Sequence, residues 1–70
     1  MEPLDWISAF AAELGVETPN QETIDVLLEL AGVAAHGSQR IAAPIAAYLV
    51  GQAALSPEIA LVVSRRISPP

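Results

Sequence analysis

Apolar side chains recur at helical spacing in the first stretch of the chain. Within residues 3–14 they fall three or four positions apart, which places them on one face of a helix: Leu4, Ile7, Phe10, Ala11 and Leu14. Pro3 suits a first helical turn, and Gly15 is placed for a left-handed stop. We therefore expect an amphipathic helix over residues 3–14.

A second helix is predicted over residues 19–36. Thr18 is placed to cap it, with Pro19 at the first helical position and Gln21 reaching back as in a capping box. The helix is expected to stop at Gly37. Its two faces differ, because one is apolar (Ile24, Leu27, Leu28, Ala31, Ala34 and Ala35) and the opposite one is acidic (Glu22, Asp25 and Glu29).

The third segment, residues 38–55, is apolar almost all round. Ser38 can cap this helix, and no residue from 41 to 57 is charged. Pro44 removes a backbone hydrogen bond, so we expect a kink near Pro44 or a short separate turn there. A helix of this kind lies at the centre of a bundle, against a partner, or in a membrane.

A fourth helix is predicted over residues 57–67, after the capping residue Ser56. Arg65 and Arg66 lie in its last turn, where cations complement the helix dipole. One of its faces is apolar: Ile59, Val62, Val63 and Ile67. No stretch alternates as a strand would. The sequence thus predicts one all-α domain over residues 1–70, a compact four-helix array with short connections.

The composition changes this picture, because the chain carries more apolar side chain than it can bury. It has 70 residues, of which 53% are hydrophobic. A domain of this size hides only about 60% of the surface that its unfolded chain exposes. The surplus must face a second copy, another protein or lipid. We therefore expect a protein partner or self-association, with Trp6, Tyr48 and Val50 as candidate interaction residues.

Charge and residue usage exclude several classes of function. The net charge of −5 argues against a nucleic-acid partner, and the absence of cysteine excludes disulfides and thiolate metal sites. Glu29 and His36 lie roughly 10 Å apart along a helix axis, too far to share one metal ion. We expect no metal, no cofactor and no catalytic residue.

The uncharged segment is shorter than the roughly 20 residues that cross a bilayer. The N-terminus has no basic region followed by an apolar run, so no signal peptide is expected. A cytoplasmic protein is the expectation, and a small membrane-associated protein is the remaining alternative.

His36, Gly37, Ser38 and Arg40 form a candidate anion-binding corner between the second and third helices. Backbone N–H groups at the start of a helix point outward, Ser38 adds a hydroxyl, and Arg40 offers a planar guanidinium for a phosphate. In the plainer interpretation, His36 and Gly37 only end a helix and Arg40 pairs with an acidic residue. Both interpretations stay open at this point.

The run Ala-His-Gly-Ser-Gln-Arg-Ile-Ala-Ala-Pro-Ile at residues 35–45, continued by Leu-Val-Gly and Ala-Ala within residues 49–54, resembles a family signature. The family is a small actinobacterial helical domain of unknown function, found alone or fused behind molybdenum cofactor guanylyltransferase-type nucleotidyltransferases. Its pattern is similar to Ala-His-Gly-x-x-Arg-Pro-Ala-Ala-Pro-Leu, and Ile41 stands where that pattern has a proline. The resemblance covers most of residues 4–54 and implies a context, molybdenum cofactor handling, rather than a reaction.

Two functional hypotheses follow. The leading one is a non-catalytic helical accessory module in molybdenum cofactor biosynthesis or molybdoenzyme maturation, which docks through exposed apolar surface. The alternative is a carrier that holds a small phosphate ligand with Ser38 and Arg40.

Overall fold

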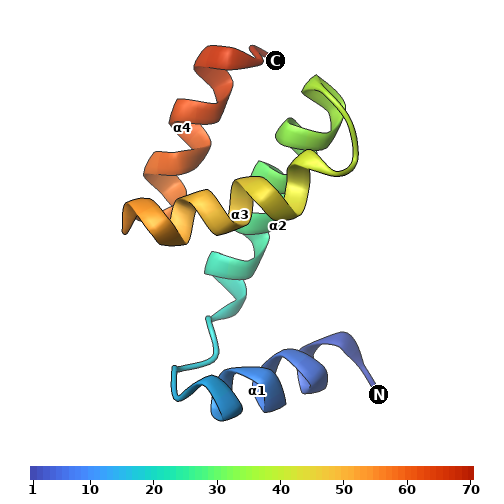
Figure 1. The fold of residues 1–70 in the computed structure, drawn as a ribbon, viewed down its shortest axis with the longest axis vertical. Coiled ribbons are helices and arrows are strands. Elements are labelled where there is room, and N and C mark those ends of the chain that lie inside the picture. The colour runs from blue at the N-terminus through green and yellow to red at the C-terminus, as the bar shows by residue number, and fades with distance from the viewer.

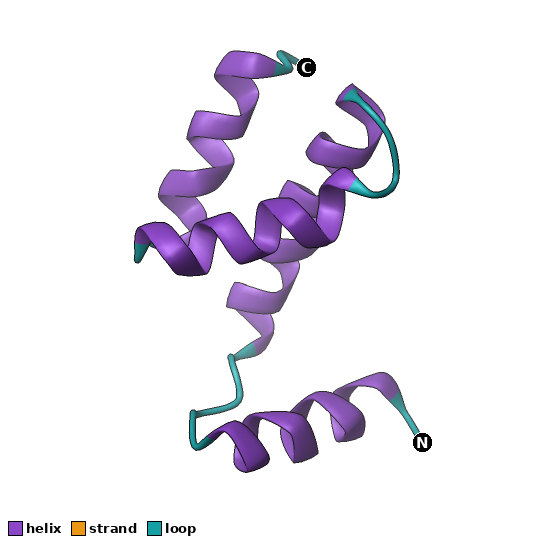
Figure 2. Cartoon of the chain, viewed as in Figure 1, coloured by secondary structure: helices purple, strands orange, loops and turns teal.

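The computed structural model describes residues 1–70, and it contains four helices and no strand (Figures 1 and 2). The helices are α1 (Pro3–Leu14), α2 (Gln21–Gly37), α3 (Ala42–Ala53) and α4 (Pro57–Ile67). None of them is long and apolar enough to cross a membrane. The predicted all-α class and the array of four helices are confirmed.

Helix α2 is the central element, because both α3 and α4 pack against it. In Figure 1, α3 crosses in front of α2, and α4 rises beside it toward the C-terminus. Helix α1 lies beyond the N-terminal end of α2 and packs on no other helix to a comparable extent. We refer to α2, α3 and α4 together as the packed unit.

Single residues determine where α1 ends and where α4 begins. Gly15 adopts a left-handed conformation with φ 76°, and the N–H of Val16 donates to the carbonyl oxygen of Ala11 at 3.0 Å. Both features belong to the Schellman motif that ends many helices. The Ser56 hydroxyl accepts a hydrogen bond from the N–H of Ile59 at 3.2 Å, which caps α4 as predicted.

Helix α2 begins at Gln21, two residues later than predicted, and its cap is Asn20 rather than Thr18. The side-chain oxygen of Asn20 accepts from the N–H of Thr23 at 2.8 Å. The side chain of Gln21 does not reach back to the cap, because it donates to Asp25 at 2.8 Å. Asn20 lies on the other side of Pro19 from Thr18, and its side chain is among those that cap helices most effectively.

Helix α3 also begins later than predicted, at Ala42 instead of Ser38. The Ser38 hydroxyl donates to the carbonyl oxygen of Ala34 at 3.1 Å, so it serves the end of α2 and does not cap α3. Pro44 is then the third residue of α3, where its missing N–H costs no intrahelical hydrogen bond. The bend expected near Pro44 is therefore a short separate turn ahead of the helix, not a kink inside it.

Only three residues are buried, Ala11, Leu30 and Ala60. Leu30 is not on the predicted apolar face of α2, whose member Leu28 is 66% exposed. The other members of the predicted face are half-buried, and the covered side of α2 extends to Leu30 because both α3 and α4 pack on this helix. On α4, the small residue Ala60 faces inward and the predicted apolar face is exposed: Ile59, Val62, Val63 and Ile67.

Candidate interaction surface

An open apolar groove of about 320 Å³ runs along the packed unit. Its walls come from the C-terminal half of α2, the first two turns of α3 and the end of α4. Most of the residues that line it are hydrophobic, including Leu30, Val33, Ile45, Leu49 and Ile67. Three of these side chains remain substantially exposed, at 59% for Ile45, 56% for Leu49 and 82% for Ile67. The groove is thus an uncovered apolar surface.

A second uncovered apolar surface lies on α1. Its exposed members are Leu4, Trp6, Phe10 and Leu14, and Ile7 between them is half-buried. The rings of Trp6 and Phe10 stack with their centroids 5.0 Å apart. These residues share one side of the helix, and we call them the α1 apolar face. Ala11, which the sequence places beside these residues, is buried, but α1 makes little contact with any other helix, so Leu4, Trp6, Phe10 and Leu14 remain uncovered.

The three predicted interaction residues lie in different surroundings. Trp6 and Tyr48 are exposed, whereas Val50 is half-buried. The structure does not gather them into one patch, since Trp6 belongs to α1 and the other two to α3. Tyr48 is the member best placed to touch a partner of the packed unit.

The structure keeps the four residues of the candidate anion-binding corner together. His36, Gly37, Ser38 and Arg40 are all exposed around the turn between α2 and α3. Because α3 begins later than predicted, these residues precede the helix rather than forming its first turn.

Hydrogen bonds already occupy the first turn of α3. The N–H of Ala42 donates to the carbonyl oxygen of Gln39 at 2.9 Å. The N–H of Ala43 donates to the carbonyl oxygen of Arg40 at 3.2 Å. The third residue is Pro44, which has no N–H. The N–H groups of Gln39, Arg40 and Ile41, which precede α3, make no hydrogen bond within the chain. The candidate anion-binding corner therefore stays a prediction.

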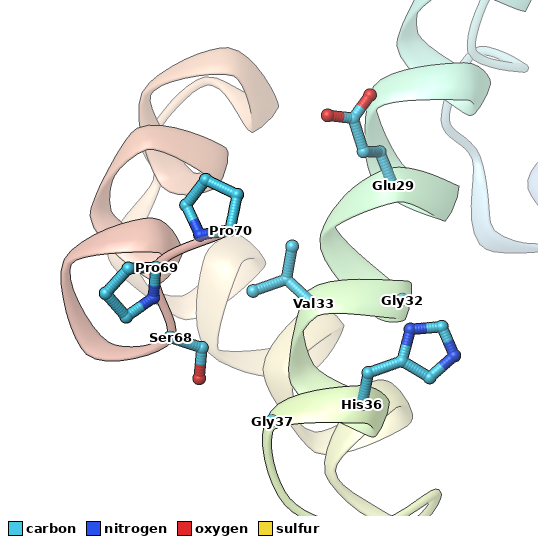
Figure 3. Close-up of a pocket in the computed structure, with 8 residues that line it drawn as sticks. All are labelled: Glu29, Gly32, Val33, His36, Gly37, Ser68, Pro69 and Pro70. Atoms are coloured by element: carbon cyan, nitrogen blue, oxygen red, sulfur yellow. The ribbon is translucent and has the colours of Figure 1, made fainter.

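A second hollow, of about 470 Å³, lies on another side of α2, between that helix and the C-terminal residues (Figure 3). Glu29 and His36 lie at its edges, and Glu29 forms an ion pair with Arg65 of α4. In Figure 3 the His36 ring lies on the side of α2 away from Pro69 and Pro70. No group of three or more potential metal-ligating side chains occurs anywhere in the chain.

Sequence reasoning missed the separation of charge along the chain. Every acidic residue except Glu58 lies within residues 1–29, and all three arginines lie from residue 40 onward. Charge patterning along the chain would have revealed this. In the structure α1 carries two acidic residues and no cation, whereas the arginines lie in α4 and in the turn between α2 and α3.

A family model matches residues 2–67 and thus spans all four helices. The chain belongs to the family described as domain of unknown function (DUF6457). No curated protein and no solved structure shows a significant match. Membership in DUF6457 confirms that the sequence resembles a family of unknown function.

Proposed function

We propose that this DUF6457 chain is a non-catalytic accessory module that docks onto another protein through its exposed apolar side chains. The observation that carries the proposal is the burial pattern: three residues are buried, and Leu30 is the only large side chain among them. Tyr48, Leu49, Ile59 and Val62 all remain more than half exposed. Large uncovered apolar patches on a folded domain mark surfaces that bind other proteins.

The proposed context is molybdenum cofactor biosynthesis or molybdoenzyme maturation. Its support is the likeness of residues 35–54 to a domain found fused behind molybdenum cofactor guanylyltransferase-type nucleotidyltransferases. The proposed partner is such a nucleotidyltransferase. Where the domain is fused to the enzyme, it lies beside it by covalent linkage. A separate chain of the same type would reach the same position by binding.

In this proposal the partner supplies the chemistry. Glu29 is engaged with Arg65, and His36 has no side-chain partner. The alternative function is a carrier that holds a small phosphate ligand with Ser38 and Arg40. Its support is that the N–H groups of Gln39, Arg40 and Ile41 make no hydrogen bond within the chain.

The experiment compares two substitutions that add the same charge to neighbouring exposed positions on α3. Tyr48→Glu removes an exposed aromatic side chain, and Gln52→Glu, one helical turn away, is the matched control. Binding of the purified chain to a purified molybdenum cofactor guanylyltransferase from the same organism is measured by calorimetry. Aromatic side chains often dominate an interface, so Tyr48→Glu is expected to weaken binding at least tenfold, roughly 1.4 kcal/mol.

The control Gln52→Glu is expected to bind like the unaltered chain. Helical circular dichroism of both variants shows whether the fold is retained. Absence of binding by the unaltered chain would overturn the proposed partner, and equal binding by all three chains would overturn the role of Tyr48.

A further inference from the structure

The α1 apolar face needs a cover that its own chain does not provide in this structure. Isolated helices shorter than about 12–15 residues are marginal in water, and α1 has 12 residues. Its apolar side chains add little stability because they are only partly buried: Phe10 is 50% exposed and Leu14 is 61% exposed. A surface that accepts this face would stabilise the helix as well as bury it.

The groove of the packed unit is a suitable acceptor, and it lies away from α1 in the same chain. The groove is lined by the C-terminal half of α2, whereas α1 is attached at the opposite end, before Gln21 (Figure 1). The connection between them is fixed at both ends by the Schellman motif at Gly15 and the Asn20 cap. This geometry favours a groove on another molecule over the groove of the same chain.

The exposed surface of the chain is large enough for an interface with a second molecule. The chain exposes 5397 Å², whereas a folded monomer of this mass is expected to expose about 4,200 Å². The excess of about 1,200 Å² exceeds the roughly 800 Å² that each partner buries in a standard interface.

The charges of the two surfaces are complementary. Asp5 and Glu13 lie on α1, which carries no arginine or lysine. Arg40 follows the groove residue Ser38, and Arg66 precedes the groove residue Ile67. Neither of these arginines forms an ion pair within the chain. An acidic helix that enters the groove would therefore meet unpaired cations at its rim.

We propose that the occupant of the groove is α1 of a second copy of this chain, and that two copies exchange their α1 helices reciprocally. Each apolar face then lies in the other copy's groove, so the interface is symmetric and closed. This inference rests on the proposed function in one respect, namely that the exposed apolar surface is a protein-binding surface. It names a partner for the groove and leaves Tyr48 outside the exchange.

The first test measures mass by sedimentation equilibrium across a range of concentrations. The unaltered chain is expected to approach twice the 7.3 kDa of a single chain. Phe10→Glu, on the α1 apolar face, is expected to weaken dimerisation at least tenfold, whereas Ala12→Glu on the opposite side of α1 leaves it unchanged. Since α1 packs little on the rest of its chain, the packed unit stays folded in both variants. A constant monomer mass, or equal dimerisation of all three chains, overturns the proposal.

The second test shows whether α1 enters the groove of another copy or the groove of its own chain. The chain has no cysteine, so introduced thiols are the only ones present. A chain carrying Leu14→Cys and Ile45→Cys is treated with a short bis-maleimide, beside a control carrying Ala12→Cys and Ile45→Cys. The exchange predicts a product of twice the chain mass for the first pair and little for the control. A cross-link within a single chain would show that α1 folds back onto its own groove, which contradicts the proposal.

The variants also separate this inference from the proposed function. Tyr48→Glu is expected to leave dimerisation unchanged while it weakens enzyme binding. If Phe10→Glu has no effect on mass but Tyr48→Glu still weakens enzyme binding, only the helix exchange fails. If the chain dimerises through α1 but does not bind the enzyme, only the proposed partner fails.

Discussion

Replacing Leu30 with alanine is expected to remove a large part of the stability of the packed unit. Leu30 is 4% exposed and is the only large side chain buried in the structure. It lies on α2, the helix on which both α3 and α4 pack. No second large buried side chain exists to compensate for its loss.

The magnitude follows from the size of the side chain and from its position. Truncation of a buried leucine to alanine removes apolar contact worth about 0.8 kcal/mol per methylene, roughly 2.4 kcal/mol in all. Leu30 also lines the open groove, so water can enter part of the space and the cavity penalty stays at the low end of its range. We expect a loss of about 2–3 kcal/mol. A core of this size rarely supplies more than about 3–5 kcal/mol, so the variant should be close to unfolding.

The control is the same substitution two positions away. Leu28 is 66% exposed, so Leu28→Ala is expected to cost under about 1 kcal/mol on the same area reasoning. Both variants are unfolded by urea and followed by far-ultraviolet circular dichroism at one low protein concentration, which keeps any self-association equal. Equal losses for the two variants would refute the reasoning, because they would mean that Leu28 is buried as deeply as Leu30.

Three further predictions concern local structure. Ala54 ends α3 with φ 55°, so Ala54→Gly should raise stability by about 0.5–1 kcal/mol in thermal melts. Asn20→Ala should cost about 1 kcal/mol in urea unfolding while Thr18→Ala costs almost nothing, and the reverse order would mean that Thr18 is the cap. Arg65→Ala removes the one ion pair of the structure and should cost under about 1 kcal/mol more than Arg66→Ala, a difference that disappears in molar salt.

Helix ends were predictable where a single residue decides them. The left-handed stop at Gly15 and the hydroxyl cap at Ser56 lie where the sequence placed them, and α4 spans the predicted residues. The prediction was wrong where two local signals competed. Ser38 can either cap a following helix or bond back to the preceding one, and the choice depends on Pro44, which fits best inside a first turn.

The sequence predicted that an uncovered apolar surface exists, but not all of the residues that form it. Composition required uncovered apolar side chains, and the structure leaves them uncovered. Periodicity could not show that α2 is packed on two sides, which turns Leu30 inward and leaves Leu28 outside. Nor could it show that the N–H groups of Ala42 and Ala43 donate to the carbonyl oxygens of Gln39 and Arg40, because that depends on where α3 begins.

Hydrogen exchange in α1, measured by mass spectrometry at two protein concentrations, tests most directly the claim that the exposed apolar surface is covered by a second copy. A short helix without packing partners exchanges its amide hydrogens rapidly, since little resists its opening. The account predicts fast exchange in residues 3–14 at low concentration and slow exchange at high concentration, with Phe10→Glu remaining fast at both. Exchange in α1 that is the same at both concentrations would contradict it.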